Sequence, residues 1–107
     1  MPINWGTGIS TGYSSGQADF NWYIRTRPKV RAAYEKIWKT EDLIVSFDGF
    51  NLFRPWQLNE KWKTNNGWYH VDQTPRQGHT GRECIQGLVN LYDTSPETGG
   101  LTVVPDS

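Results

Sequence analysis

The spacing of hydrophobic and polar residues along this chain predicts a loop, then a helix, then short strands. Residues 1–17 show no periodicity and carry glycines and hydroxyl residues, which predicts a flexible leading loop. From Arg27 the spacing becomes helical, and Pro28 suits the first turn of a helix. The apolar positions follow i, i+3, i+4, i+7 and i+8: Val30, Ala33, Tyr34, Ile37 and Trp38. We predict a helix over residues 27–39 that packs this stripe against a sheet.

After the helix, the apolar residues come in short runs that are typical of strands. Residues 43–47 and 50–53 flank Asp48-Gly49, so they predict a hairpin with a two-residue turn. Pro55 ends the second strand because proline has no N–H for a ladder. Further strands are expected over residues 67–72, 83–91 and 100–104.

One helix followed by about five short strands favours an antiparallel sandwich or jelly roll over a βαβ sheet. A complete jelly roll needs about eight strands, and residues 43–104 supply little more than half of them. The expected fold is therefore mainly β with an N-terminal helix, a partial jelly roll in a single incomplete domain over residues 1–107. Unpaired strand edges of such a half barrel predict self-association unless another segment completes the sheet.

Composition and charge bear on location and partners. Eleven basic and eleven acidic residues balance without a run of either sign, so no nucleic-acid partner is expected. No apolar stretch approaches the roughly 20 residues of a spanning helix, and residues 1–17 lack the pattern of a signal peptide. The single cysteine, Cys84, cannot form an internal disulfide. We therefore expect a cytoplasmic protein without a membrane partner.

Aromatic residues are frequent, with six Trp, five Tyr and four Phe among 107 residues. Two interpretations are open. The rings pack inside a β-rich fold, or Trp56, Trp62 and Trp68 form an exposed platform for a carbohydrate or peptide.

His70 and Asp72 are the candidate metal ligands. Side chains at i and i+2 of a strand share one face, about 6.6 Å apart at roughly 3.3 Å per residue. One metal ion can bridge that gap, and an imidazole with a carboxylate supplies two of the three ligands of the 2-His-1-carboxylate Fe(II) site. The alternative is a pair of side chains that hydrogen-bond to each other or to the following loop.

The wider pattern resembles the phytanoyl-CoA dioxygenase-like family of Fe(II)/2-oxoglutarate-dependent oxygenases. The resemblance covers residues 25–107 and is most specific at His70-Val71-Asp72-Gln73 and at residues 99–105, Gly-Gly-Leu-Thr-Val-Val-Pro. The blocks that carry it, in chain order, are residues 46–49, 53–56, 68–73, 86–91 and 99–105. It implies a double-stranded β-helix that holds ferrous iron and oxidises an organic substrate while 2-oxoglutarate is decarboxylated to succinate.

Carried over residue by residue, the resemblance makes His70 and Asp72 the first two iron ligands. Both must be deprotonated to bind, so binding is expected to fail at low pH. Gln86, Leu88 and Asn90 fall on the strand that lines the co-substrate pocket, although a core strand with two satisfied amides is the alternative. Arg54 meets a carboxylate at the barrel mouth or forms a surface ion pair.

The resemblance also has gaps. In the family, a third ligand histidine and an arginine for 2-oxoglutarate follow well beyond the Gly-Gly-Leu strand, whereas this sequence ends at Ser107, and Asp106 stands where glycine is common. His79, in a loop, is a poor replacement for that histidine. We therefore expect a part of a dioxygenase that is inactive by itself, acts on a small-molecule or acyl substrate and needs a C-terminal segment to complete the barrel. The alternatives are a non-catalytic β-sandwich that binds a ligand and a vestigial family member.

Overall fold

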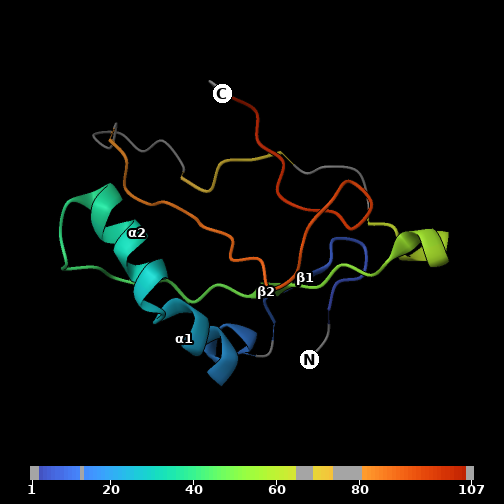
Figure 1. Ribbon diagram of the computed structural model, residues 1–107, viewed down its shortest axis with the longest axis horizontal. Coiled ribbons are helices and arrows are strands. Elements are labelled where there is room, and N and C mark those ends of the chain that lie inside the picture. The colour runs from blue at the N-terminus through green and yellow to red at the C-terminus, as the bar shows by residue number, and fades with distance from the viewer. Residues whose placement is uncertain (1–2, 13, 65–68, 74–80, 106–107) are drawn as a thin grey trace.

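The structure, a computed structural model, describes residues 3–12, 14–64, 69–73 and 81–105. Its elements in chain order are β1 (Ile9–Ser10), η1 (Ser15–Gln17), α1 (Asp19–Arg25), α2 (Pro28–Trp38), β2 (Phe50–Asn51), η2 (Trp56–Leu58) and η3 (Glu60–Trp62). The α-helices lie at one end of the molecule and the η2 and η3 turns at the other, with the small sheet between them (Figure 1).

The helix at Pro28–Trp38 lies inside the range 27–39 that the sequence predicts. Pro28 opens it, and Lys39 ends it in the left-handed conformation at φ 56° and ψ 36°. None of its side chains is buried, and Ile37 is 44% exposed. Its predicted packing against a sheet is wrong for the described residues, because β1 and β2 are too short to cover an eleven-residue helix.

The helix α1 spans Asp19–Arg25 and was not predicted from the sequence. Seven residues are too few for a clear helical period. Asp19 in the first turn and Arg25 in the last suit the helix dipole, but the fixing contacts are tertiary. Arg25 Nη1 donates to the Gly16 carbonyl at 2.5 Å, and Nη2 donates to the carbonyl of Asp48.

The predicted hairpin between residues 43–47 and 50–53 is wrong. β2 pairs with β1 instead, antiparallel, with Ser10 opposite Phe50, while residues 43–47 form no strand. Two contacts of the predicted turn explain this pairing. Gly49 lies against the backbone of Ser10 with no room for a Cβ, and the carbonyl of Asp48 accepts a hydrogen bond from Arg25 of α1. The leading segment is accordingly more ordered than a loop over 1–17 implies: Gly8 N donates to the Asn4 carbonyl at 2.7 Å, which closes the turn before β1.

The best buried side chains in the described part of the chain are polar. Ser10 and Ser15 are 1% and 0% exposed, and Asn21 is 8% exposed. Ser15 Oγ donates to the Ser10 carbonyl at 2.9 Å, and Asn21 Nδ2 donates to the Ser15 carbonyl at 2.7 Å. Two edge-to-face ring pairs, Phe20 with Phe50 and Trp22 with Phe47, join α1 to the β2 region around this polar cluster.

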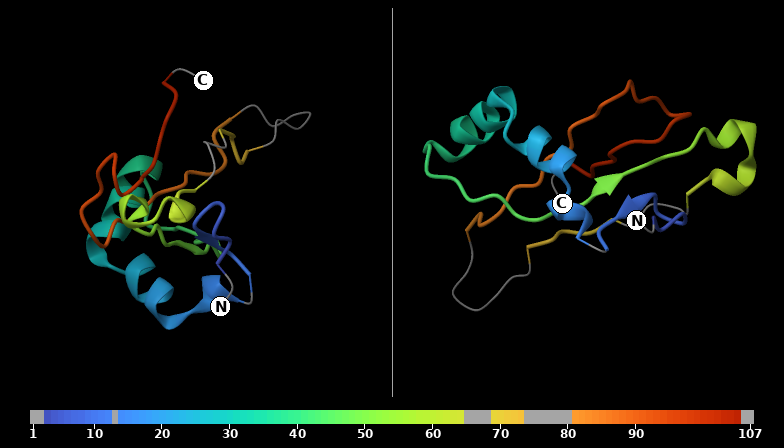
Figure 2. Two further views of the ribbon diagram at one scale, coloured as in Figure 1. Left: turned by 90° about the vertical axis from the view of Figure 1, so that its right-hand side faces the viewer. Right: turned by 90° about the horizontal axis from the view of Figure 1, so that it is seen from below.

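Residues 81–105 cross the molecule as a long connection that first passes α2 and then approaches the β2 region (Figures 1 and 2). A Cβ at Gly87 would lie 2.3 Å from the Tyr34 hydroxyl of α2, and one at Gly99 would lie 3.5 Å from the Phe53 ring. Residues 83–91 and 100–104 are not assigned to strands in the described part of the chain, whose sheet consists of β1 and β2. The jelly roll stays a prediction. Neither helix of the described chain has the length and apolar character to span a bilayer.

Candidate metal centre

Gln73 holds the two segments of the candidate site together. Its Oε1 accepts from the Glu83 backbone N–H at 2.8 Å, and its Nε2 donates to the Gly81 carbonyl at 2.5 Å. Residues 81–86 are hereafter the returning segment. Because the Gln73 side chain is hydrogen-bonded to two backbone groups of this segment, residues 69–73 and 81–86 lie side by side. This role of Gln73 was not predicted from the sequence, although Gln73 is the fourth residue of the His-x-Asp-Gln block.

His70 and Asp72 are in direct contact. His70 Nε2 lies 3.0 Å from Asp72 Oδ1, and each side chain is 39% exposed. Gln86 Nε2 donates to the other oxygen, Asp72 Oδ2. The two oxygens of Asp72 are therefore divided between an imidazole from its own segment and an amide from the returning segment.

This arrangement is compatible with both interpretations of the pair. Two ligand atoms in adjacent octahedral positions, each about 2.1 Å from an ion, lie about 3.0 Å apart. A hydrogen-bonded His-Asp pair has the same separation. Within the described ranges, no group of three or more His, Cys, Asp and Glu side chains converges on one point. His79, weighed as a third ligand, lies outside the described residues.

The three residues assigned to the co-substrate pocket have different surroundings. Gln86 reaches the candidate site through Asp72. Leu88, at 40% exposed, and Asn90 lie on the surface farther along the same segment. The structure thus connects Gln86 to the pair, and the assignment of Leu88 and Asn90 stays a prediction.

Arg54 forms no ion pair with the described residues, and its contact with a carboxylate at the barrel mouth stays a prediction. Its guanidinium carbon lies 4.0 Å from the ring centre of Trp5 and 5.1 Å from that of Trp62. Lys63 Nζ similarly lies 5.0 Å from the ring centre of Trp56. Trp56 and Trp62 are each half-buried, and each has a cation against its ring. Their rings therefore differ from those of the open aromatic platform that was one interpretation of the sequence. Trp68 lies outside the described residues.

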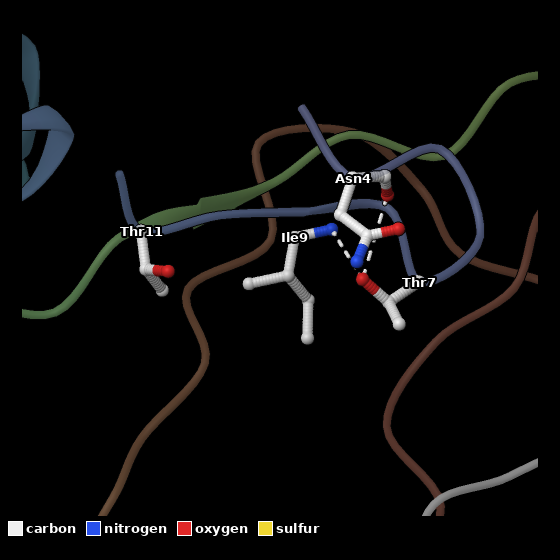
Figure 3. A pocket seen from close by; sticks show the side chains of 4 residues that line it. All are labelled: Asn4, Thr7, Ile9 and Thr11. Carbon is white, nitrogen blue, oxygen red and sulfur yellow. Dashed lines mark hydrogen bonds between the residues drawn. The ribbon is translucent and has the colours of Figure 1, made fainter. Parts of the chain in front are cut away.

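An open hollow of about 400 Å³ lies on the N-terminal segment, lined by Asn4, Thr7, Ile9 and Thr11 (Figure 3). Thr7 Oγ1 donates to the Asn4 carbonyl and accepts from the Ile9 N–H, both at 3.4 Å. Its lining contains no ionisable side chain, so it is not part of the candidate metal centre.

Two curated relatives are similar to this chain. An Aspergillus versicolor protein named "Ava biosynthesis cluster protein O" is 38% identical over 80 residues, which cover 75% of this chain and 24% of the relative. A Dictyostelium discoideum protein named "Putative phytanoyl-CoA dioxygenase" is 31% identical over 111 residues, which cover 76% of this chain and 32% of the relative. The chain thus spans about a quarter to a third of the length of these relatives.

No protein-family model and no solved structure matches the chain. The first relative's name identifies no chemistry. The second relative's name suggests an oxygenase-like family, in agreement with the resemblance carried by the His70-Val71-Asp72-Gln73 block.

Proposed function

We propose that this chain supplies part of the catalytic domain of an Fe(II)/2-oxoglutarate-dependent dioxygenase, a hydroxylase of the phytanoyl-CoA dioxygenase-like family. The observation that carries the proposal is the His70–Asp72 pair at 3.0 Å, in a chain similar to a relative with a dioxygenase name. The proposal includes the partial jelly roll, whose strands within residues 43–104 form when another segment of the barrel pairs with them.

His70 and Asp72 fit ferrous iron by the chemistry of their donor atoms and by their spacing. A neutral imidazole nitrogen and a carboxylate oxygen are two of the ligand types of the facial triad, and their separation suits adjacent positions around one ion. Both side chains are partly open to solvent, so an ion has access to them. When bound, iron together with 2-oxoglutarate supplies the oxidising chemistry.

Gln86 has a positioning role in this proposal. By donating to Asp72 Oδ2, it fixes the rotation of the carboxylate and leaves Oδ1 on the side of His70. Hydrogen bonds to the ligands of a metal orient them and tune their basicity. Leu88 and Asn90 then line the co-substrate pocket on the segment that follows.

A two-ligand site holds a metal weakly. We therefore include in the proposal a further C-terminal segment that completes the barrel and brings a third histidine and an arginine for the co-substrate. The substrate is a small molecule or an acyl compound whose class depends on the walls of the completed pocket.

Metal binding by the chain tests the proposal. Mn(II), a redox-stable substitute for Fe(II), is titrated into the protein and the free ion is counted by electron paramagnetic resonance. We expect His70→Ala and Asp72→Asn each to weaken binding by at least about tenfold, because at other metal sites even the loss of a residue that only supports a ligand costs about that much. Asp93→Asn, which removes an exposed carboxylate elsewhere in the C-terminal part, is the matched control.

Equal Mn(II) affinity in the wild-type protein, His70→Ala and Asp72→Asn would contradict the assignment of these two residues. It would favour the alternative in which the pair is a structural hydrogen bond. Helical circular dichroism of each variant shows whether α1 and α2 are intact, so that a loss of affinity is attributed to the ligand and not to unfolding.

A further inference from the structure

Arg54 is a guanidinium without an acceptor in the described chain. Three other arginines show the contrast: Arg25 donates to backbone carbonyls, Arg27 donates from Nε to the Tyr23 carbonyl at 2.8 Å, and Arg31 pairs with Glu35 at 2.5 Å. Arg54 is half-buried, yet its recorded contacts are the faces of Trp5 and Trp62. Glu60, in the same turn as Trp62, forms no ion pair with it in the described structure.

The two rings that hold Arg54 come from separate, hydrogen-bonded turns. Trp5 belongs to the turn closed by Gly8 N and the Asn4 carbonyl at 2.7 Å. Trp62 ends η3, whose first residues are fixed by Asn59: its Oδ1 accepts from Lys61 N at 3.1 Å, and its carbonyl accepts from Trp62 N at 2.9 Å. The guanidinium thus joins the N-terminal turn to η3.

Stacking uses the faces of a guanidinium and leaves its N–H donors pointing outward in the plane. No side-chain nitrogen of the half-buried or buried residues that the structure describes is both fully buried and without a partner, so the guanidinium nitrogens of Arg54 reach the surface. A partly desolvated cation gains more from an anion than a fully hydrated one does, and the fork of an arginine matches a carboxylate or phosphate with two parallel hydrogen bonds. Lys63, next to Trp62, adds a second positive charge to the same segment.

We propose that Trp5, Arg54 and Trp62, hereafter the Arg54 site, bind the carboxylate or phosphate group of a small molecule. The donors are the in-plane N–H groups of Arg54, and the two indoles hold them in place. This proposal is independent of the iron site, since it uses no residue of the His70–Asp72 pair.

The test follows the indole N–H signals of Trp5 and Trp62 by nuclear magnetic resonance while succinate or inorganic phosphate is added at constant ionic strength. Trp5→Phe and Trp62→Phe identify the two signals. We expect saturable shifts of both signals with at least one of the two anions, and binding at least tenfold weaker in Arg54→Gln. Saturation by succinate alone assigns the site to carboxylates, and saturation by phosphate alone assigns it to phosphates.

Arg27→Gln is the matched control, because Arg27 also stacks on a ring, 3.7 Å from the centre of Tyr23, but its Nε is already bonded. It should leave the titration unchanged. Arg54→Lys keeps the charge and removes the planar fork, so we expect binding three- to tenfold weaker; this variant decides the matter if Arg54→Gln loses helical circular dichroism. Shifts that do not saturate, or that Arg54→Gln and Arg54→Lys leave unchanged, would overturn the proposal.

Discussion

At the scale of single residues, the candidate metal centre depends on how Asp72 divides its two oxygens. Oδ1 faces His70 Nε2 at 3.0 Å, and Oδ2 accepts from Gln86. A carboxylate with one oxygen fixed by an amide has less rotational freedom to lose when the other oxygen binds a metal. Gln86 therefore contributes to the site without being a ligand.

Replacing Gln86 measures that contribution. Gln86→Leu removes the hydrogen bond to Asp72 Oδ2 and should lower Mn(II) affinity by about tenfold, the lower end of the usual effect of such supporting residues. Gln57→Leu, which removes an exposed amide in η2, is the control and should leave the affinity unchanged. The same paramagnetic titration measures both. If Gln86→Leu binds Mn(II) as the wild-type protein does, Gln86 has no positioning role.

The contact between His70 and Asp72 was within reach of sequence analysis, because it joins residues two apart whose side chains share one side of an extended segment. The contacts of Gln73 and Gln86 could not be predicted in this way. They join residues 8 and 14 positions apart, and local spacing carries no information about contacts between residues so far apart in the sequence. The stacking of Arg54 on Trp5 could not be predicted either, because these two residues are also far apart in the sequence.

At the scale of elements, the close approach of Gly49 to β1 decides which strand β2 pairs with. A Cβ on residue 49 would lie 1.8 Å from the Ser10 carbonyl oxygen, which is backbone and cannot turn aside. Gly49→Ala should therefore separate β1 from β2 at a cost of about 1–3 kcal/mol in the free energy of unfolding, as overpacking does elsewhere.

Gly12→Ala is the control for this substitution, because no described atom beyond its chain neighbours lies within 4 Å of a Cβ at that position. Urea unfolding followed by circular dichroism measures both variants, and amide exchange of Leu52, whose N–H donates to Gly8 at 2.7 Å beside the strands, reports the pairing. Equal stability of the two variants would show that residue 49 does not touch β1.

The end of α2 offers a second test on an element. Lys39 adopts φ 56°, a conformation that costs a residue with a Cβ about 1 kcal/mol and costs glycine little. Lys39→Gly should raise the free energy of unfolding by about 0.5–1 kcal/mol, whereas Lys36→Gly, inside the helix, should lower it by about 1 kcal/mol. Thermal unfolding distinguishes the two signs, and a loss of stability in Lys39→Gly would place the end of the helix elsewhere.

The elements also show which patterns are sufficient for prediction. The helix at Pro28–Trp38 has three turns of periodic apolar residues and a proline at its start, so its local signals agree with one another. The Asp48-Gly49 turn signal is equally local, but Asp48 and Gly49 are bonded and packed against α1 and β1, and these contacts override it. The conformation of a short element therefore depends on the other elements that it contacts.

At the scale of the whole molecule, the chain is expanded. Its radius of gyration is 15.7 Å, whereas a compact domain of this length has about 13 Å. No hydrophobic side chain among the described residues is buried, and in residues 101–103 the side chains of Leu101 and Val103 are 73% and 70% exposed. Two exposed apolar side chains so close together give this segment a hydrophobic surface that water solvates poorly.

Such a segment predicts association between copies of the chain wherever nothing else covers it. We expect the apparent mass in sedimentation velocity to rise with protein concentration. Leu101→Ser with Val103→Ser should reduce that rise, because it removes two neighbouring apolar side chains from the segment. Ile44→Ser is the control: Ile44 is 99% exposed but lies outside this segment. A monomer at all concentrations would mean that Leu101 and Val103 do not bring copies of the chain together. Association that Ile44→Ser reduces as much as the double substitution would instead mean that general apolar exposure, and not the apolar residues of this segment, is responsible.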